Sequence, residues 1–485
     1  MTDDQNQTSQ TSQNEAVAPV APVTQTVPTA PVTESATAVM TPPAKATPVA
    51  LATPAPTAAI KPAPKTDEAK KPEVKSSTAQ KAMLQNAVIA GNIPQMVLYA
   101  ISYALHMGAS DVHIEPEEKT VRVRFRVDGM LRHIIEYPQN IHPAVVSRIK
   151  IMSNLKIDEQ RIPQDGRTHV TTEDHRSIDL RISSLPTVNG EKIVMRLQDK
   201  TKKIPDLPEL GLAGTDLEKM ERFTELTNGI ILVTGPTGSG KTNTLYSTLA
   251  RLNKVGVNIM TFEDPVEYQM DGLSQSQMRP DIDYDFASGL RTALRQDPDI
   301  IMVGEIRDQE TIEIAIRAAL TGHLVLSTIH TNSAIGTLTR ISDMGVKPFL
   351  ITSAIRGIAS QRLVRTICPF CKEKFTPDPT LAAEIRKELR GVSEKDLDPK
   401  LLGDLTLYKG KGCEACNNFG YQGRVAVFEI LELDRDLAQL ILDGAPEADL
   451  TAQAQKDGML TMKQSGFIKA LEGVTSVEEI YRITK

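Results

Sequence analysis

An eight-residue glycine-rich stretch has the residue types and spacing that point most directly to chemistry. It follows the apolar run 229–233 and precedes a segment with leucines at helical spacing. Glycines let backbone N–H groups turn inward around a phosphate, and the N-terminus of a following helix adds its positive end. The predicted phosphate-binding loop consists of Gly235, Pro236, Thr237, Gly238, Ser239, Gly240, Lys241 and Thr242.

Lys241 and Thr242 close this loop and have separate expected roles. The Lys241 ammonium is expected to reach the β- and γ-phosphates of a nucleotide, and the Thr242 hydroxyl is expected to ligate Mg²⁺. The alternative is a chance glycine-rich turn. The apolar strand before the stretch and the helix after it disfavour that alternative.

Acidic residues follow the next two apolar runs along the chain: Glu263, Asp264 and Glu267 after one run, and Glu305 after the other. Ligands and catalytic groups in open α/β sheets gather at the carboxyl ends of strands. One carboxylate is expected to help hold Mg²⁺, and another to orient or deprotonate the attacking water. Any single one could instead be a solvated loop acid, and spacing does not decide which acid has which role.

Two histidines flank a further apolar run, 324–329. His323 precedes the run and His330 follows it. A histidine at such a position either senses the γ-phosphate of a bound nucleotide or simply packs or caps a neighbouring element. Both interpretations stay open for each residue.

The chain has four cysteines, in two C-x-x-C pairs: Cys368, Cys371, Cys413 and Cys416. Four thiolates can close tetrahedrally around Zn²⁺, and a closed four-sulfur site is structural rather than catalytic. The alternatives are a pair of redox dithiols and a site that carries no metal. No thioredoxin-like βαβ pattern surrounds either pair, which favours zinc.

Composition limits the class of protein. The 485 residues carry a formal net charge of -6, with 40% hydrophobic and 4% aromatic residues. That balance gives no electrostatic reason to expect direct nucleic-acid binding. The N-terminus lacks a basic and then apolar signal pattern, and no window approaches 18 apolar residues. A cytoplasmic protein, at most peripheral to a membrane, is expected.

Changes in pattern divide the chain into four parts. Residues 1–80 are rich in Pro, Ala and Thr and predict a disordered tail, either a tether or a solubilising segment. Residues 81–203 predict an α/β domain, and 204–365 alternate apolar strands with helices, which is typical of a parallel sheet. Residues 366–485 predict a tetracysteine zinc subdomain with a helical C-terminus.

The predicted N-terminal domain begins with a helical pattern over 83–107, broken at Gly91 and Pro94. Strands with a period of two follow, up to a turn after residue 127, and further strands extend to residue 197. Three arginines alternate along one of these strands, at Arg122, Arg124 and Arg126. A solvated face or ion pairs at a subunit interface explain them best, with contact to nucleotide as the second interpretation.

Taken together, the motifs resemble those of the ATPases of type II secretion and type IV pilus assembly. The resemblance covers roughly residues 80–485. The core segments that carry it are GPTGSGKTNTLYS, TFEDPVEY, LRQDPDIIMVGEIRD and LTGHLVLSTIHTNSA, which are similar to the P-loop, aspartate box, Walker B and histidine box. The flanking segments that carry it are ASDVHIEP, VRVRFRVDG, RIPQDGR, LRISSLPTVNGEKIVMRL, CPFCKEKF, CEACNNFGYQGRVAVFEIL and EGVTSVEEIYRIT.

The resemblance implies a RecA-like P-loop ATPase core, an N-terminal PAS-like α/β domain and a C-terminal zinc and helical subdomain. It implies ATP as substrate, with Mg²⁺ held by Thr242 and Glu305, the Walker B acid. It implies Glu263 as the catalytic carboxylate, and His330 in the histidine box. Arg181 and Arg196 lie where family members contact nucleotide from the N-terminal domain, with surface pairing as the alternative; Arg167 is undecided.

The resemblance further implies a homo-hexameric motor that assembles a pilus or pseudopilus through an inner-membrane platform protein, at the inner face of the cytoplasmic membrane. A pilus retraction motor is the first alternative, disfavoured because retraction motors generally lack the tetracysteine region. A nucleic-acid translocase is the second, and a scaffold that binds ATP without turnover is the third. The Pro/Ala/Thr tail departs from the family, in which many members carry a folded N-terminal module that docks on the platform or binds a signalling nucleotide.

Overall fold

The structure is a computed structural model, and it describes residues 77–172, 176–199 and 203–484. The predicted tail 1–80 lies outside the described residues except at its end, where helix α1 begins at Ser77.

Two helices open the described chain, α1 (Ser77–Ile89) and α2 (Ile93–His106). The predicted break between them is confirmed. Gly91 has a positive φ of 62°, and the Asn92 side chain caps α2 by accepting a hydrogen bond from the Gln95 backbone. The first helix starts before the predicted residue 83 because its first turn is largely exposed and carries no apolar period to reveal it.

The N-terminal domain contains an antiparallel sheet of six strands in the order β3-β2-β1-β6-β5-β4. Its elements are β1 (Ala109–Pro116), β2 (Thr120–Val127), β3 (Met130–Pro138), a 3-10 turn (Gln139–Ile141), α3 (His142–Met152), β4 (Gln164–Thr171), β5 (Ser177–Thr187) and β6 (Gly190–Asp199). Burial alternates residue by residue along β2, as the period of two predicts.

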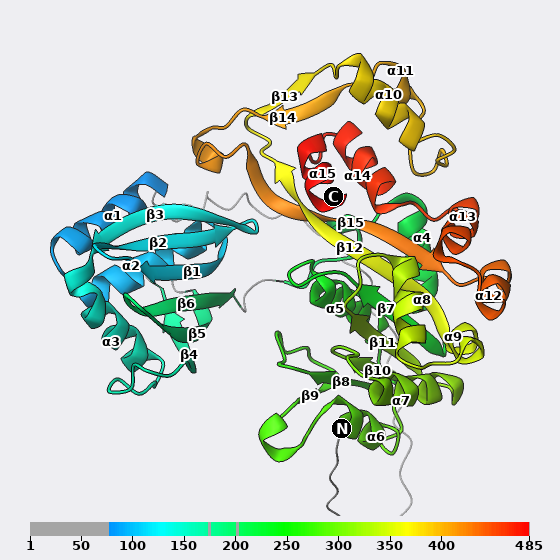
Figure 1. The fold of residues 1–485 in the computed structure, drawn as a ribbon, viewed down its shortest axis with the longest axis horizontal. Helices are drawn as coiled ribbons and strands as arrows, with labels where there is room; N and C mark the ends of the chain where they lie inside the picture. Colours follow the sequence, from blue (N-terminus) through cyan, green and yellow to red (C-terminus); the bar gives the residue numbers. More distant parts are fainter. Residues whose placement is uncertain (1–76, 173–175, 200–202, 485) are drawn as a thin grey trace, which may run out of the picture. The chain divides into compact units, whose positions relative to one another are not determined.

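The core is a sheet of seven strands in the order β15-β12-β7-β11-β10-β8-β9. Its strands are β7 (Gly229–Thr234), β8 (Ile259–Glu263), β9 (Leu273–Gln277), β10 (Ile300–Val303), β11 (Leu324–Ile329), β12 (Ile355–Ile367) and β15 (Tyr421–Glu432). All neighbours pair in parallel except β12 and β15, which run antiparallel side by side (Figure 1). The four apolar runs of the sequence are the strands β7, β8, β10 and β11, as predicted.

Helices cover both faces of the core sheet, which is why these strands are apolar throughout. The helices between strands are α4 (Gly214–Thr224), α5 (Lys241–Leu252), α6 (Phe286–Ala293), α7 (Gln309–Leu320), α8 (Ala334–Asp343) and α9 (Pro348–Ala354). One apolar cluster joins α4 and α5 to the sheet, and a second joins α6, α7, α8 and α9 to it. The core is therefore an α/β layered structure, as the sequence predicted.

The C-terminal region packs along β12 and β15 (Figure 1). It contains β13 (Lys372–Phe375), α10 (Pro379–Glu388), α11 (Lys400–Gly403), β14 (Leu407–Gly410), α12 (Arg435–Leu442), α13 (Glu447–Lys456), α14 (Met462–Leu471) and α15 (Val477–Thr484). β13 and β14 form a separate two-stranded sheet. Short 3-10 turns occupy Pro208–Leu210, Pro280–Ile282 and Glu414–Cys416. Among the described residues, none of the helices is both long and apolar enough to span a membrane.

Candidate functional site

The glycine-rich loop connects the end of β7 to the start of α5, the strand-turn-helix context that the motif requires. Gly235, Gly238 and Gly240 have φ values of 146°, 77° and 92°. Residues with a Cβ rarely adopt these conformations. The loop can therefore keep this path, with α5 beginning at Lys241, only if these three positions are glycine.

Lys241 is held inside the loop. Its Nζ donates hydrogen bonds to the carbonyl oxygens of Gly235 at 2.9 Å and Pro236 at 3.3 Å. Burial lowers the pKa of Lys241, and the Arg362 charge lowers it further, while Glu305 acts in the opposite direction. A partly desolvated ammonium in a glycine loop is suited to bind an anion such as a phosphate.

Glu263, at the end of β8, is 3% exposed and has three hydrogen-bond donors around its carboxylate. Thr261 Oγ1 donates at 2.6 Å and Gln275 Nε2 at 3.1 Å to Oε1, and the Tyr246 hydroxyl donates to Oε2. Burial raises the pKa of Tyr246, and its bond to Glu263 raises it further. The Glu263 carboxylate is therefore fixed in orientation as a hydrogen-bond acceptor.

Glu305 follows β10 and pairs with two residues from different places in the chain. Its Oε2 lies 3.3 Å from Nε2 of His330, and its Oε1 pairs with the Arg307 guanidinium. His330 directly follows β11, the strand beside β10. The two parallel strands thus bring the predicted Walker B acid and the predicted sensor histidine into contact.

His323 has a different environment. Its Nδ1 lies 2.9 Å from the carbonyl oxygen of Ala318 and 3.2 Å from the Thr321 hydroxyl. These groups belong to the C-terminal end of α7. The sequence left two interpretations open for each histidine. His323 caps the C-terminal end of α7, whereas His330 contacts Glu305.

A cavity of about 580 Å³ lies where these elements meet. Loop residues from Thr237 to Thr242 line it, together with Glu263, Glu305 and His330. Asp264, Glu267 and Arg307 also line it. The core therefore brings together the predicted phosphate loop, both predicted acids and the predicted histidine at the carboxyl ends of parallel strands.

Arg181 and Arg196 lie in the N-terminal domain, as directly opposed residues of β5 and β6. Arg196 Nε donates to Asp111 Oδ1 at 3.0 Å. Both arginines, with Arg167 on β4, line a hollow of about 520 Å³ in that domain. The guanidinium groups of three strands thus gather on one part of the sheet.

Carboxylates of the same domain face the three arginines of β2. Arg124 forms two hydrogen bonds with Glu115, at 2.7 and 2.9 Å. Arg122 pairs with Glu117, and Arg126 Nε lies 3.6 Å from Asp111. Burial opposes ionisation of Glu115, but Arg124 and Lys192 hold its pKa down at about 2. The charges of β2 are therefore neutralised inside the domain's own sheet, and the predicted pairing at a subunit interface is not needed to explain them.

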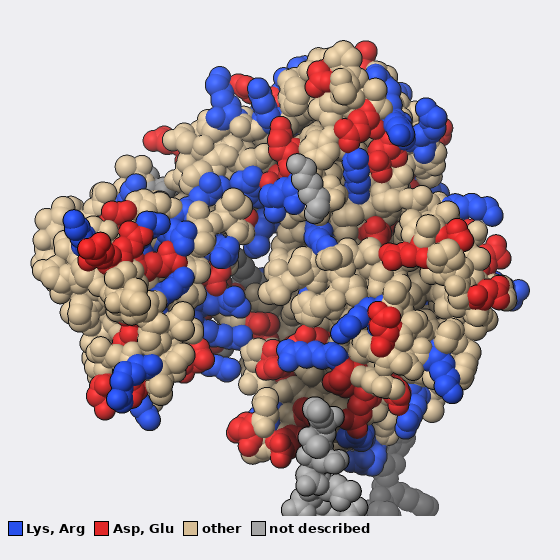
Figure 2. Space-filling model, viewed as in Figure 1, with Lys and Arg blue, Asp and Glu red and all other residues tan. Residues whose placement is uncertain are grey.

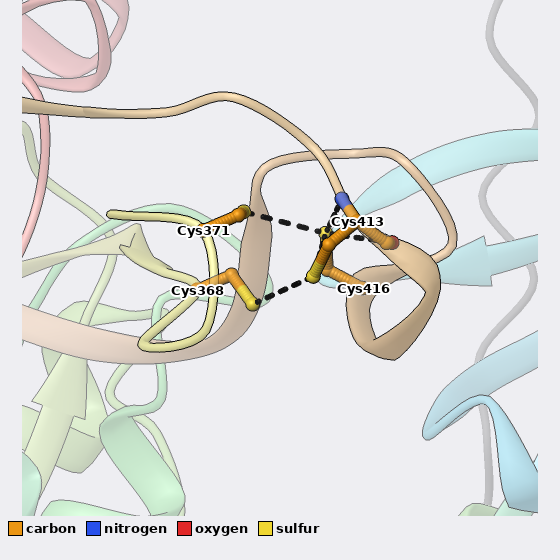
Figure 3. A group of neighbouring side chains, drawn as sticks. All are labelled: Cys368, Cys371, Cys413 and Cys416. Carbon is orange, nitrogen blue, oxygen red and sulfur yellow. Dashed lines mark hydrogen bonds between the residues drawn. The ribbon is translucent and has the colours of Figure 1, made fainter. Parts of the chain in front are cut away.

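The four cysteines converge from two chain segments that are 45 residues apart (Figure 3). Cys368 and Cys371 follow β12, and Cys413 and Cys416 bracket the turn before β15. All four Sγ atoms lie within 4.8 Å of one another, and no disulfide joins them. Contacts between Sγ atoms measure 3.8 Å for Cys368–Cys413, 3.8 Å for Cys371–Cys416 and 3.7 Å for Cys413–Cys416.

These sulfur positions fit a tetrahedral zinc ion. Zn–S bonds of about 2.3 Å at tetrahedral angles place sulfurs about 3.8 Å apart. Backbone N–H groups also point at the sulfurs, from Gly412 to Cys371 at 3.3 Å and from Gly420 to Cys416 at 3.2 Å. Such donors stabilise thiolates. The donor set and its spacing therefore suit a closed structural metal site.

Residues 87–482 match the family model described as type II/IV secretion system protein. The chain belongs to this family. It is 46% identical over 393 residues to the type II secretion system protein E of Pseudomonas aeruginosa, covering 81% of this chain and 76% of that protein. It is 45% identical over 388 residues to the type IV pilus assembly ATPase PilB of Myxococcus xanthus, covering 80% and 67%.

Solved structures agree with this membership in the secretion family. The crystal structure of the pilus retraction motor PilT with bound ADP aligns with a TM-score of 0.53 and 27% identity, covering 80% of this chain and 96% of that one. Family membership, with ATPases among the relatives and structural neighbours, makes this protein an ATP hydrolase.

Several residues of this secretion ATPase contact the predicted site residues, although the sequence analysis did not predict them. Tyr246 and Gln275 bond Glu263, and Gln361 bonds the phosphate loop from β12. Tyr246 lies inside the quoted P-loop segment, yet nothing in its spacing indicates that its hydroxyl reaches β8. Gln275 and Gln361 give no signal in the sequence, because their partners come from distant segments.

Charge is distributed without a dominant sign on the face of the core and C-terminal region that Figure 2 shows. Acidic and basic side chains alternate over that face. Such a mixture matches the modest net charge of -6.

Proposed function

We propose that this chain is the motor ATPase that drives assembly of a type IV pilus or a type II secretion pseudopilus. The observation that carries the proposal is similarity at 45–46% identity, over about four-fifths of this chain, to proteins named for these two systems. The contact between Glu305 and His330 at the mouth of a phosphate loop supports turnover as its activity.

Lys241 neutralises charge on the phosphates of ATP, and the N-terminus of α5 adds its positive end. Thr242 and Glu305 are the residues that would hold Mg²⁺, and both line the same cavity. When bound, Mg²⁺ neutralises the phosphate oxygens and favours in-line displacement. These assignments predict that Lys241 acts in binding and in the transition state alike.

Glu263 orients the attacking water in this proposal. Its carboxylate accepts from Thr261, Gln275 and Tyr246, so it has one fixed direction. A positioned carboxylate accepts a proton or hydrogen bond from water more effectively than a freely rotating one. In this proposal His330, which pairs with Glu305, reports the γ-phosphate to the segment that leads into α8.

Arg181 and Arg196 contribute positive charge from the N-terminal domain. A guanidinium is planar and permanently charged, which suits it to stabilise charge on a transferring phosphoryl group. In this proposal the protein acts as a homo-hexamer, with the N-terminal domain moving against the core as ATP binds and is hydrolysed. The Zn²⁺ site, made by the four cysteines, is structural.

The motor works in the cytoplasm, peripheral to the inner face of the cytoplasmic membrane. An inner-membrane platform protein receives the motion and passes it to pilin subunits. No direct contact with nucleic acid is part of this function. Membrane association through a partner is consistent with described helices that are too short or too polar to span a bilayer.

The experiment that tests the proposal is steady-state ATP hydrolysis by the purified chain, with mass measured in the presence of nucleotide. Lys241→Ala and Glu263→Gln are the matched variants. A hexamer whose turnover collapses in both variants is the expected result. An assembled wild-type ring that binds ATP without turnover would instead indicate a nucleotide-gated scaffold.

Extension and retraction are separated in cells. Deleting the gene for an assembly motor removes surface fibres or secretion, whereas deleting a retraction motor leaves fibres in excess. This chain is 45% identical to an assembly ATPase and 27% identical to the retraction motor PilT. We therefore expect deletion of its gene to remove the fibres. Excess fibres after deletion would favour the retraction motor.

A further inference from the structure

The side chain of Gln361 lies buried beneath the phosphate loop, although no motif includes it. Gln361 is on β12 and is 1% exposed. β12 pairs with β7 up to the partners Ser360 and Thr234, so Gln361 comes next to the loop's first residue, Gly235. The sheet therefore places an uncharged, hydrogen-bonding side chain directly under the loop.

Two buried hydrogen bonds join the Gln361 amide to the nucleotide site. Its Nε2 donates to the carbonyl oxygen of Ser239 at 2.6 Å. Its Oε1 accepts from Thr244 Oγ1 at 2.7 Å. Ser239 is in the loop, and the fully buried Thr244 is in the first turn of α5. One amide thus ties the loop and the start of its helix to the same strand.

The bond to Ser239 has a consequence for the next peptide group. A trans peptide is planar, and its C=O and N–H point in opposite directions. Since the Ser239 carbonyl points toward Gln361, the N–H of Gly240 points away from β12. Gly240 lines the cavity, so this N–H belongs to the set that can cradle a phosphate.

Close packing against β12 also restricts the loop. A Cβ added at Gly235 would lie 2.5 Å from the Gln361 carbonyl oxygen, and one added at Gly240 would lie 3.1 Å from Gln361 Nε2. The loop thus rests directly on Gln361, with little space for it to change its path. A shift of the Gln361 side-chain amide would therefore reach Gly240, and a shift of its backbone would reach Gly235.

We propose that Gln361 is a positioning residue of the nucleotide site, which holds the Ser239–Gly240 peptide and Thr244 in the orientation that binds phosphate. A terminal amide supplies a donor for Ser239 and an acceptor for Thr244 from two separate atoms, without a charge. The proposal rests on the assignment of residues 235–242 as the nucleotide loop.

The test compares variants by the Kd of a fluorescent ATP analogue, by kcat and KM, and by the melting temperature without nucleotide. Gln361→Met keeps the volume but leaves both partners unbonded, so Kd is expected to rise about tenfold. Gln361→Glu keeps the acceptor for Thr244 but turns an oxygen toward the Ser239 carbonyl. It is therefore expected to bind more weakly than Gln361→Met.

Thr244→Val removes only the hydroxyl that reaches Oε1, and its Kd is expected to rise about threefold. In the double variant with Gln361→Met, Thr244→Val should add little, because its partner is already gone. Gln439→Met is the matched control. Gln439 is an exposed residue of α12 that bonds only Asp443 among the described contacts, and its variant should bind like the wild type.

A Kd within twofold of wild type in Gln361→Met overturns the proposal. This holds even if the melting temperature falls, because unchanged affinity with lower stability indicates a purely structural role. If Gln361→Met does not fold, wild-type affinity in Thr244→Val overturns it equally. Lys241→Ala separates the two levels of inference. If that variant binds normally, the assignment of the loop has failed; if it does not bind but Gln361→Met does, only the role of Gln361 has failed.

Discussion

The phosphate loop and the cysteine cluster represent two different ways of building a binding site. The loop presents backbone groups, with glycines at positive φ and Lys241 as the main charged side chain. The cysteine cluster presents four side chains, brought together from segments 45 residues apart. The loop keeps its shape because the core sheet supports it, whereas the cluster adds a link between two segments that strand pairing already brings together.

Because of this difference, removing a side chain is expected to affect catalysis at one site and the fold at the other. Removing a side chain from the loop is expected to change catalysis and leave the fold, since β7, β12 and α5 hold the backbone. Removing a cysteine is expected to change the fold around the cluster and to have a smaller effect on ATP turnover. β12 connects the two sites, since its middle lies beside the loop at Ser360 and Gln361 and its end leads directly into Cys368.

The largest expected effect is loss of turnover in Lys241→Ala. Removing a charge that stabilises the transition state costs about 10²–10³-fold in kcat. The melting temperature without nucleotide should stay within about 2 °C of wild type, because β7, β12 and α5 still hold the backbone of the loop. Coupled-enzyme kinetics and thermal unfolding measure the two quantities, and a large fall in melting temperature would contradict the comparison.

Cys413→Ser is expected to give the opposite pattern. It removes one of four thiolates, so zinc measured by mass spectrometry should fall below one ion per chain, and the region around 368–420 should become sensitive to protease. Turnover should change less than about tenfold, since no cysteine lines the nucleotide cavity. Loss of turnover as great as in Lys241→Ala would erase the distinction between the two sites.

Glu479→Gln tests how β12 is held near the cysteines. Glu479 is nearly buried, and its carboxylate accepts from the Arg365 guanidinium at 2.7 Å and from the Arg365 backbone at 2.9 Å. Leaving Arg365 without its partner should cost about 3 kcal/mol, measured by urea unfolding of the C-terminal region. Arg482 also pairs with Glu479, so the substitution leaves a second guanidinium without its carboxylate and adds to the loss.

The same pair predicts a dependence on pH. Burial opposes ionisation of Glu479, but hydrogen bonds from Arg482 and Arg365 hold its pKa down at about 2. A carboxyl group with a depressed pKa in the folded state stabilises the fold above its unfolded pKa of about 4.3. That stabilisation is lost as the pH falls toward 2. In Glu479→Gln this part of the pH dependence should disappear.

Tyr246→Phe has the smallest expected effect. It removes one of three donors to Glu263 and leaves the loop intact. Turnover should fall about tenfold, with KM for ATP unchanged, because a less well oriented carboxylate acts in the chemical step rather than in binding. A rise in KM without a change in kcat would place Tyr246 in nucleotide binding instead.

Much of the core could be predicted because its signals are local. Each apolar run of four to six residues became a buried parallel strand, and the glycine loop followed the first of them. The predicted acids and His330 line one cavity, since parallel strands end on the same edge of a sheet. The domain boundaries and the catalytic roles stay predictions.

Other features depended on partners that are distant in the sequence. The pairing of β15 with β12 brings residues 421–432 into the core sheet, although the sequence pattern assigned them to the C-terminal subdomain. The carboxylates that face Arg122, Arg124 and Arg126 come from β1 and from the turn that follows it. Register between strands decided these contacts, and no single segment encodes register.

The sequence by itself determined the chemical groups of this secretion ATPase: a loop that only glycines can form, carboxylates after apolar strands, and four thiolates in two pairs. Local sterics and spacing suffice for each of these. Only the tertiary structure decided which of two histidines meets Glu305, which donors orient Glu263, and that Gln361 supports the loop. Those choices follow from strand order and packing, which bring together residues that are up to 122 positions apart.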